Sequence, residues 1–285
     1  MRKFILGTDW WTDCDDAVAI RMLARAHRRG EIELVGIGMN ACMPYSVSSL
    51  RGFMEAEGIG NVPLGIDLDA TDFGGTPPYQ KNMSEYFNNR YTNADALDAV
   101  ELYRRLLRES DGKVEIIEIG YPQVLASVIE SEPELFVEKV EKVWIMAGKW
   151  DKDGERENNF CRNARASVAA EKLCRLCPVP MTFLGWEIGI DVLTGGNLPE
   201  DDYLHRALVD HGSGAGRCSW DPMLVLIALI GDEERAGYDS HVGYATIDAA
   251  DGSNYFRHDC NGMHKFVTKK FDNSYYENAI NSLIN

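Results

Sequence analysis

Residues 3–17 read KFILGTDWWTDCDDA, and an amphipathic stretch continues from them to residue 28. The first five of these residues form a short β-rich run that is typical of a strand, whereas residues 15–28 repeat apolar side chains at helical spacing. Four aspartates lie within eight positions at the junction of the two segments: Asp9, Asp13, Asp15 and Asp16. A strand, an acidic turn and a helix in this order are the opening unit of an α/β fold.

The same alternation of strand and helix recurs along the chain. The predicted pairs are 3–7 with 15–28, 32–38 with 47–57, 62–66 with 95–109, 114–119 with 124–130, 143–146 with 166–177, and 181–184 with 201–210. Such alternation predicts a mostly parallel β-sheet with helices on both faces, an open Rossmann-like sheet. Short extra strands near the C-terminus are expected at 242–247, 255–258 and 265–268, before a helix at 275–283. We expect a single domain over residues 1–285.

Composition narrows the choice of ligand and compartment. The chain has 29 basic and 45 acidic residues, so its formal net charge of −16 disfavours nucleic acid and favours a cation or a neutral polar molecule. Charged Asp9 comes too early for a signal peptide, and the longest later apolar run, 223–230, is too short to span a bilayer. Seven scattered cysteines indicate reduced thiols. We therefore expect a cytoplasmic protein without membrane contact.

The aspartate turn is the strongest local signal of function. Packed carboxylates repel one another unless a cation compensates them, and hard oxygen ligands suit calcium or magnesium better than zinc. Open α/β sheets bind ligands at the carboxyl edge of the strands, where this turn is expected. Helix capping by Asp13 or Asp15, with Asp16 in the first turn, is the alternative, and it accounts for two of the four aspartates.

Further polar residues follow other predicted strands or begin helices, and we expect them at the same edge. They are Asn40 after the second strand, Glu118-Ile119-Gly120 at the fourth, Glu157-Asn158-Asn159 after the fifth, and Asp221 at the start of an apolar helix. Carboxylate and amide groups in these places are suited to sugar hydroxyls, which need paired donors and acceptors once they are desolvated. Taken singly, Asn40 and Asn159 also fit ordinary turn residues.

Together these segments resemble the inosine-uridine-preferring nucleoside hydrolase family, from the aspartate turn to the segment Trp220-Asp221-Pro222. The other matching motifs are Gly38-Met39-Asn40, Ile119-Gly120, Glu157-Asn158-Asn159-Phe160, and Leu184-Gly185-Trp186-Glu187 followed by Leu193-Thr194. The resemblance implies a nucleoside hydrolase-like fold and calcium-dependent hydrolysis of the N-glycosidic bond of a ribonucleoside or related riboside. Free base and ribose would be the products, and the enzyme would be a homodimer or homotetramer.

The resemblance also implies residue roles. Asp9 would bind calcium and act as the general base that activates the attacking water, while Asp15 would bind ribose hydroxyls. The remaining calcium ligands would be Asp16, the carbonyl oxygen of Ile119 and Asp221, and the ribose would be surrounded by Asn40, Glu157 and Asn159.

Two features depart from the family pattern. The gap between Asp9 and the aspartate pair is longer and contains Asp13, which is then either a further metal ligand or a helix cap. Trp220 stands where the family has a histidine thought to protonate the departing base, and an indole cannot act as that acid. Trp220 either stacks on the base or is a core tryptophan. His211, at the start of the glycine-rich segment 211–219, is a candidate acid or merely an exposed histidine.

Other base contacts and other functions stay open at this point. Tyr79 and Tyr86, within the long connection 67–93, and Trp10 and Trp11 are alternative contacts to the base, although the two tryptophans fit packing positions equally well. A non-catalytic nucleoside or ribose sensor that keeps the metal and sugar site is the main functional alternative. A metal-dependent phosphatase fits less well, because the aspartate turn contains no basic residue to receive phosphate.

Overall fold

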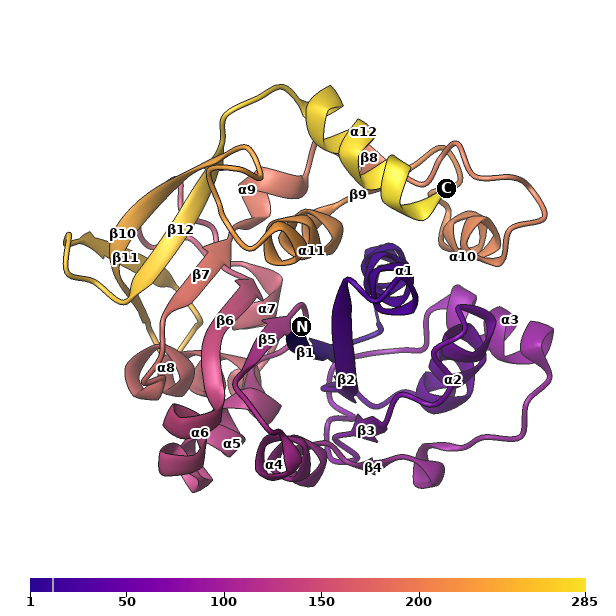
Figure 1. Cartoon of the computed structure of the whole chain (residues 1–285), viewed down its shortest axis with the longest axis horizontal. Coiled ribbons are helices and arrows are strands. Elements are labelled where there is room, and N and C mark those ends of the chain that lie inside the picture. The colour runs from indigo at the N-terminus through magenta and orange to yellow at the C-terminus, as the bar shows by residue number, and fades with distance from the viewer. Residues whose placement is uncertain (12) are drawn as a thin grey trace.

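The structure is a computed structural model that describes residues 1–11 and 13–285 (Figure 1). Within these residues, ten strands form one sheet in the order β11-β10-β12-β7-β6-β5-β1-β2-β3-β4, and β8 and β9 form a separate pair. The strands are β1 (Arg2–Thr8), β2 (Ile32–Met39), β3 (Leu64–Ile66), β4 (Leu97–Asp98), β5 (Val114–Glu118), β6 (Val140–Met146), β7 (Met181–Leu184), β8 (Leu193–Thr194), β9 (Arg217–Cys218), β10 (Tyr238–Ile247), β11 (Asn254–His258) and β12 (His264–Lys269).

The strand order places a topological switch point at β1. From β1 the chain moves outward through β2 and β3 to β4, then returns to β5 on the other side of β1 and continues to β6 and β7. These pairings are parallel, with Gly7 of β1 opposite Glu118 of β5, whereas β10 is antiparallel to both β11 and β12. Ligands of open α/β sheets bind at the carboxyl ends of strands beside such a switch point.

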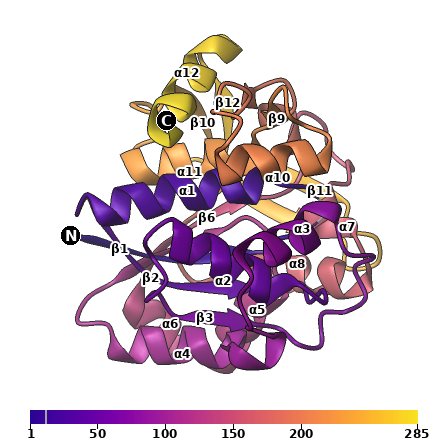
Figure 2. The ribbon, with the colours of Figure 1, turned by 90° about the vertical axis from the view of Figure 1, so that its right-hand side faces the viewer.

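Helices cover both faces of the sheet, as the sequence pattern predicted. They are α1 (Asp15–Arg28), α2 (Ser46–Ala56), α3 (Pro78–Phe87), η1 (Asn93–Asp95), α4 (Ala99–Glu109), α5 (Gln123–Ser131), α6 (Pro133–Lys139), α7 (Asn158–Cys161), α8 (Ala164–Leu176), α9 (Trp186–Gly189), α10 (Tyr203–His211), α11 (Trp220–Ile230) and α12 (Asn273–Ile284). Figures 1 and 2 show α1, α2 and α11 on one face and α4, α5 and α8 on the other.

Strand β1 shows why both faces must be covered. Phe4 and Leu6 belong to the apolar cluster under α1 and α11, whereas Ile5 belongs to the cluster under α4, α5 and α8. Successive side chains of a strand point to opposite faces, so an uninterrupted apolar run needs a layer of helices on each side. The expected α/β fold with a mostly parallel sheet is confirmed.

The differences from the predicted elements have local causes. Helix α3 lies inside the connection 67–93, where its start at Pro78 is hidden among prolines and glycines. The pair β8 and β9 was not predicted because two-residue strands carry too little pattern to be detected. In the described part of the chain no helix combines the length and apolar character needed to cross a bilayer. All seven cysteines are free thiols in the structure.

Candidate metal and sugar site

A small cavity of about 120 Å³ opens at the carboxyl edge of the sheet, beside the switch point. It brings together most of the residues that the sequence singled out. The described residues that line it are Asp9, Asp13, Asp15, Asp16, Ile119, Met146, Glu157, Asn158, Asn159, Trp186, Trp220 and Asp221. Acidic and amide side chains therefore meet a pair of tryptophans in one concave site.

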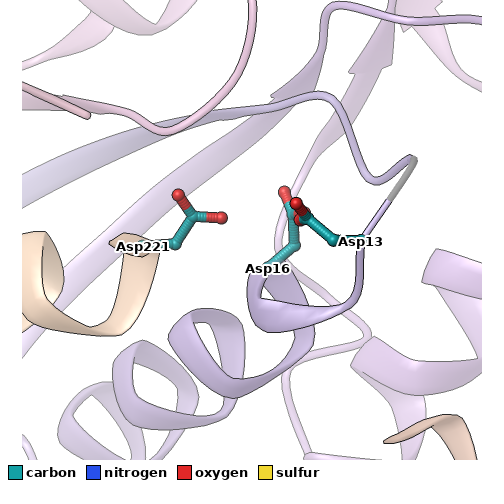
Figure 3. A group of neighbouring side chains, drawn as sticks. All are labelled: Asp13, Asp16 and Asp221. Carbon is teal, nitrogen blue, oxygen red and sulfur yellow. The ribbon is translucent and has the colours of Figure 1, made fainter. Parts of the chain in front are cut away.

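Three carboxylates form an oxygen cluster in this cavity. One oxygen from each of Asp13, Asp16 and Asp221 lies within 4.8 Å of the others. Figure 3 shows Asp13 and Asp16 at the start of α1 and Asp221 at the start of α11, with the three carboxylates directed into the same space. Helix α1 begins after Cys14, and among the described residues no side chain caps it. The interpretation of Asp13 or Asp15 as the helix cap was therefore wrong.

The electrostatics of the cluster fit a hard divalent cation. Burial, followed by the charge of Asp13, raises the pKa of Asp16 to about 8. Burial and then the neighbouring aspartates also raise the pKa values of Asp9, Asp15 and Asp221 well above the usual range. Within the described chain, the buried Oδ2 of Asp16 has no hydrogen-bond partner. A bound cation would satisfy this oxygen and favour the ionised carboxylates, and all-oxygen ligation suits calcium.

The turn after β1 fixes the position of Asp9. Trp10 adopts a left-handed conformation with φ of 47°, which is rare for a bulky side chain. Its N–H lies 3.1 Å from Oγ1 of Thr8, whose hydroxyl donates to Asp16, and the N–H of Trp11 donates to Asp9 at 3.1 Å. The indoles of Trp10 and Trp11 are buried and donate to Ser49 and to the carbonyl of Gly75. The two tryptophans are thus packing residues.

Glu157 and its neighbours form the opposite wall of the cavity. Burial raises the pKa of Glu157 to about 7, although its carboxylate accepts hydrogen bonds of 2.9 Å from the backbone N–H groups of Asn159 and Gly148. The Asn159 amide donates to the carbonyl of Met146 at 2.9 Å, which leaves its oxygen for another group. The Asn158 amide donates to the hydroxyl of Tyr121 at 3.2 Å. Glu157 and Asn159 are thus positioned by backbone contacts and Asn158 by a side chain, as a preformed polar site requires.

Asn40 lies outside the described lining of the cavity. Its amide donates to Glu118 at 2.7 Å and its oxygen accepts from the N–H of Tyr121 at 2.9 Å, so it joins the ends of β2 and β5. Its contact with ribose stays a prediction. Glu118 was expected at this edge among the groups suited to sugar hydroxyls; it is fully buried beside Asn40, and burial raises its pKa to about 8. Its carboxylate occupies the space that a side chain at Gly7 would need.

Two tryptophans stand side by side at the cavity. The rings of Trp186 and Trp220 are stacked with their centroids 6.3 Å apart, and the Trp220 indole N–H donates to the Trp186 carbonyl at 2.6 Å. Trp220 is half-buried and packs against the apolar cluster under α1 and α11, so it is not a fully buried core residue, and 38% of Trp186 is exposed. Trp186 was present in the matching sequence motifs, but only the structure shows it beside Trp220.

The remaining candidates are not among the described residues that line the cavity. His211 ends α10, where its Nδ1 lies 2.9 Å from the hydroxyl of Ser213. Tyr79 is buried, and Tyr86 is half-exposed below the guanidinium of Arg206. The structure also brings Arg217 of β9 to the aspartates. It is not in the described lining of the cavity, but its guanidinium forms an ion pair of 2.9 Å with Asp13. No local pattern marked Arg217, because it is distant from the aspartate turn in the sequence.

Comparisons with known proteins bear on the fold. No protein-family model matches the sequence, and no curated protein matches it either. Among solved structures, the chain is similar to an inosine-guanosine nucleoside hydrolase (15% identity, 100% of this chain and 99% of that chain, TM-score 0.76). It is also similar to the plant nucleoside hydrolase PpNRh1 (18% identity, 99% and 98%, TM-score 0.77).

A protein of another kind is also similar. The type III effector XopQ, solved in complex with adenosine diphosphate ribose, is 16% identical over 99% of this chain and 92% of that chain, with a TM-score of 0.68. Identities this low show the fold alone. The chain therefore has the fold of the nucleoside hydrolases.

Proposed function

We propose that this protein hydrolyses the N-glycosidic bond of a ribonucleoside or related riboside and binds Ca²⁺ for this reaction. The observation that carries the proposal is the cluster of Asp13, Asp16 and Asp221 at the switch-point edge of the sheet, inside a cavity lined by further hydrogen-bonding groups. The similarity in fold to nucleoside hydrolases supports it. We expect these three carboxylates and the carbonyl oxygen of Ile119 to hold the ion.

The residues of the cavity account for the chemical step. Bound calcium would orient the attacking water and make it somewhat more acidic. Asp9 lines the same cavity outside the three-carboxylate cluster. Its ligation of calcium stays a prediction, and we assign it the role of general base that accepts a proton from the water. General-base catalysis of this kind accelerates a reaction about 10²–10⁴-fold. The C–N bond breaks as the new C–O bond forms on the opposite face of the sugar, with inversion.

The reaction also requires stabilisation of the positive charge that develops on the sugar. The transition state resembles an oxocarbenium ion, so carboxylates and amide oxygens near the ring stabilise it more than they stabilise the ground state. Asp15, Glu157 and the free amide oxygen of Asn159 line the cavity and serve this purpose in the proposal. Asn158 borders the same wall. We place the base against Trp220 and Trp186, which offer an aromatic surface at the cavity.

A sensor that binds ribosides without turnover is the second candidate. Two observations favour it: no histidine is found among the described residues that line the cavity, and the fold is shared with XopQ, an effector solved with adenosine diphosphate ribose. His211 stays a predicted acid, and it would have to reach the departing base from the end of α10. Homodimer or homotetramer assembly, a cytoplasmic location and a single domain over residues 1–285 likewise stay predictions.

Hydrolysis of p-nitrophenyl riboside, inosine, uridine and guanosine, with and without prior removal of calcium, tests the proposal. The nitrophenyl group needs little protonation to leave, so this substrate reports on the metal and ribose groups alone. We expect calcium-dependent turnover of the nitrophenyl riboside, and its ratio to the natural nucleosides measures how well the base is activated. Ribose binding without turnover of any substrate would instead establish the sensor. Turnover of p-nitrophenyl phosphate alone would favour a phosphatase.

A further inference from the structure

Among the described basic side chains, Arg217 is the one that forms ion pairs with the aspartate turn. Its guanidinium is mostly buried, with 18% of the side chain exposed, and its Nη2 lies 2.9 Å from Oδ2 of Asp13. The Nε of the same guanidinium lies 4.0 Å from Oδ1 of Asp15, a separation too long for a hydrogen bond. Arg217 therefore approaches two aspartates of the cavity but makes close contact with only one of them.

The atoms that face each other across this gap are both unpaired. Within the described chain, neither the Nε of Arg217 nor the Oδ1 of Asp15 has a hydrogen-bond partner, although both atoms are buried. The other carboxylate oxygen of Asp15 accepts the backbone N–H of Asp221 at 3.1 Å, which holds the carboxylate in place. A buried donor and a buried acceptor without partners are unfavourable in a folded protein, and they often mark the place of a ligand.

We propose that Arg217 and Asp15 bind one hydroxyl group of the substrate sugar between them. The Nε–H of Arg217 donates to the hydroxyl oxygen, and the hydroxyl hydrogen is donated to Oδ1 of Asp15. A hydroxyl is suited to this place because it is a donor and an acceptor at once, whereas a hydrogen atom is neither. The inference rests on the proposed function and adds a specificity-determining residue to it: Arg217 makes the site select a ribosyl over a deoxyribosyl group.

The surroundings of Arg217 hold the guanidinium in position. Arg217 pairs with Thr194 across β8 and β9, and its carbonyl accepts the hydroxyl of Ser219 at 3.0 Å. The guanidinium lies over the ring of Trp220 at 5.1 Å from its centre. Helix α12 anchors β8, because Glu277 accepts the N–H of Leu193 at 3.0 Å. A donor fixed in this way loses little conformational freedom when the hydroxyl binds.

The test compares Arg217→Met and Arg217→Lys with the wild type and with Arg206→Met as a matched control. Arg206 is an exposed arginine on α10 that also lies over an aromatic ring, but the described ion pairs with the aspartate turn are made by Arg217 and not by Arg206. The value of kcat/KM is measured for inosine, 2′-deoxyinosine and 3′-deoxyinosine, and calcium binding is measured by calorimetry. For Arg217→Met we expect kcat/KM for inosine to fall about 10–100-fold, the usual effect of losing a charged hydrogen bond.

For the analogue that lacks the bound hydroxyl, kcat/KM should change less than about threefold between wild type and Arg217→Met. Its disadvantage against inosine therefore largely disappears in the variant. Arg217→Lys, which keeps the charge but not a donor at Nε, should give an intermediate loss, and Arg206→Met should match the wild type. An equal fall for all three nucleosides with weaker calcium binding would overturn the inference, because Arg217 would then act through Asp13. Ratios of kcat/KM between inosine and its two deoxy analogues that are the same in Arg217→Met as in wild type would overturn the inference as well.

The same comparison works if no nucleoside is hydrolysed. Calorimetric binding of ribose and 2-deoxyribose to wild type and Arg217→Met, in saturating calcium, then replaces turnover. Loss of the preference for ribose in the variant supports the role of Arg217 even though hydrolysis has failed. A wild-type protein that binds ribose and 2-deoxyribose equally well overturns the inference alone, and one that binds neither sugar and hydrolyses no riboside defeats the proposed function too.

Discussion

The backbone N–H of Asp221 donates a hydrogen bond of 3.1 Å to the carboxylate of Asp15. This contact joins the first turns of α11 and α1, which pack side by side on one face of the sheet (Figure 2). Two helix N-termini therefore point toward one group of carboxylates, and their dipoles favour negative charge there. Even so, burial and mutual repulsion outweigh the helix dipoles and raise the pKa values of these carboxylates. This explains why the site needs a cation.

Calcium should stabilise the protein, and removing one carboxylate of the cluster should abolish this effect. In calcium-free protein the pKa of Asp16 is raised to about 8, so the folded state binds more protons than the unfolded state between about pH 4 and 8. Stability should therefore decrease as pH rises through this range. Calcium at a hundredfold excess over its Kd should raise the free energy of unfolding by about 2.7 kcal/mol, which corresponds to a Tm increase of about 5 °C.

Thermal unfolding with calcium and with chelator measures this effect. In Asp221→Asn we expect calcium to leave the Tm unchanged, and the calcium-free variant should be at least as stable as calcium-free wild type. A calcium-dependent Tm that survives in Asp221→Asn would place the ion elsewhere.

Asp9 and Asp13 should differ in what their substitution changes. Asp13 belongs to the oxygen cluster and Asp9 does not, although both line the cavity. We expect Asp13→Asn to weaken calcium binding, measured by calorimetry. Asp9→Ala should lower kcat by about 10²–10⁴-fold while calcium binding changes less. Full activity in Asp9→Ala would exclude its role as the general base.

Trp220→Ala should weaken binding of the base more than binding of the sugar. Loss of one stacking contact costs about 1–3 kcal/mol, so the KM for inosine should rise by about 5–150-fold. Ribose, used as an inhibitor, should lose much less affinity, because it has no ring to stack and is affected only through the contact of Trp220 with Arg217. Tyr255→Ala, an exposed aromatic on β11, is the control and should change neither value. Equal losses for inosine and ribose would argue for a purely structural Trp220.

Gly120→Ala should disturb the turn that holds Asp9. A Cβ atom at Gly120 would lie well inside van der Waals contact with the backbone nitrogen of Asp9 and the amide oxygen of Asn40. Overpacking of this kind costs about 1–3 kcal/mol, and we expect a lower Tm together with a lower kcat. Gly112→Ala is the matched control, because no atom lies within 4 Å of the added Cβ. If both variants melt alike, the close approach at Gly120 is unimportant.

Glu233 should contribute stability that is lost in acid. Burial alone would raise its pKa, but the hydrogen bond of 2.7 Å from Lys142 and the charges of Lys142 and Lys265 lower it to about 2. A depressed carboxyl pKa stabilises the fold above the unfolded value near 4.5, and this contribution disappears as pH falls toward 2. It amounts to at most about 3 kcal/mol. In urea unfolding, the free energy of unfolding of the wild type should exceed that of Glu233→Gln above pH 5, and this difference should shrink below pH 3.

Much of the fold could be predicted from local patterns. The uninterrupted apolar run at residues 4–7 required helices on both faces of the sheet, and the structure confirms the strands and helices that flank the aspartate turn. Helix α3 was not anticipated, because proline, which stands at its first position, is also typical of turns. Most of the predicted site residues line one cavity because parallel strands bring their carboxyl ends to the same edge.

The order of neighbouring residues was enough to predict the parallel α/β architecture, the acidic character of its functional edge and the resemblance on which the calcium and riboside predictions rest. The fold was needed to show that Asp13 joins Asp16 and Asp221, that Asn40 turns to Glu118, and that Arg217 faces Asp15. Ångström-scale distances between distant segments are set by how helices and short strands pack, and local sequence patterns carry no measure of those distances.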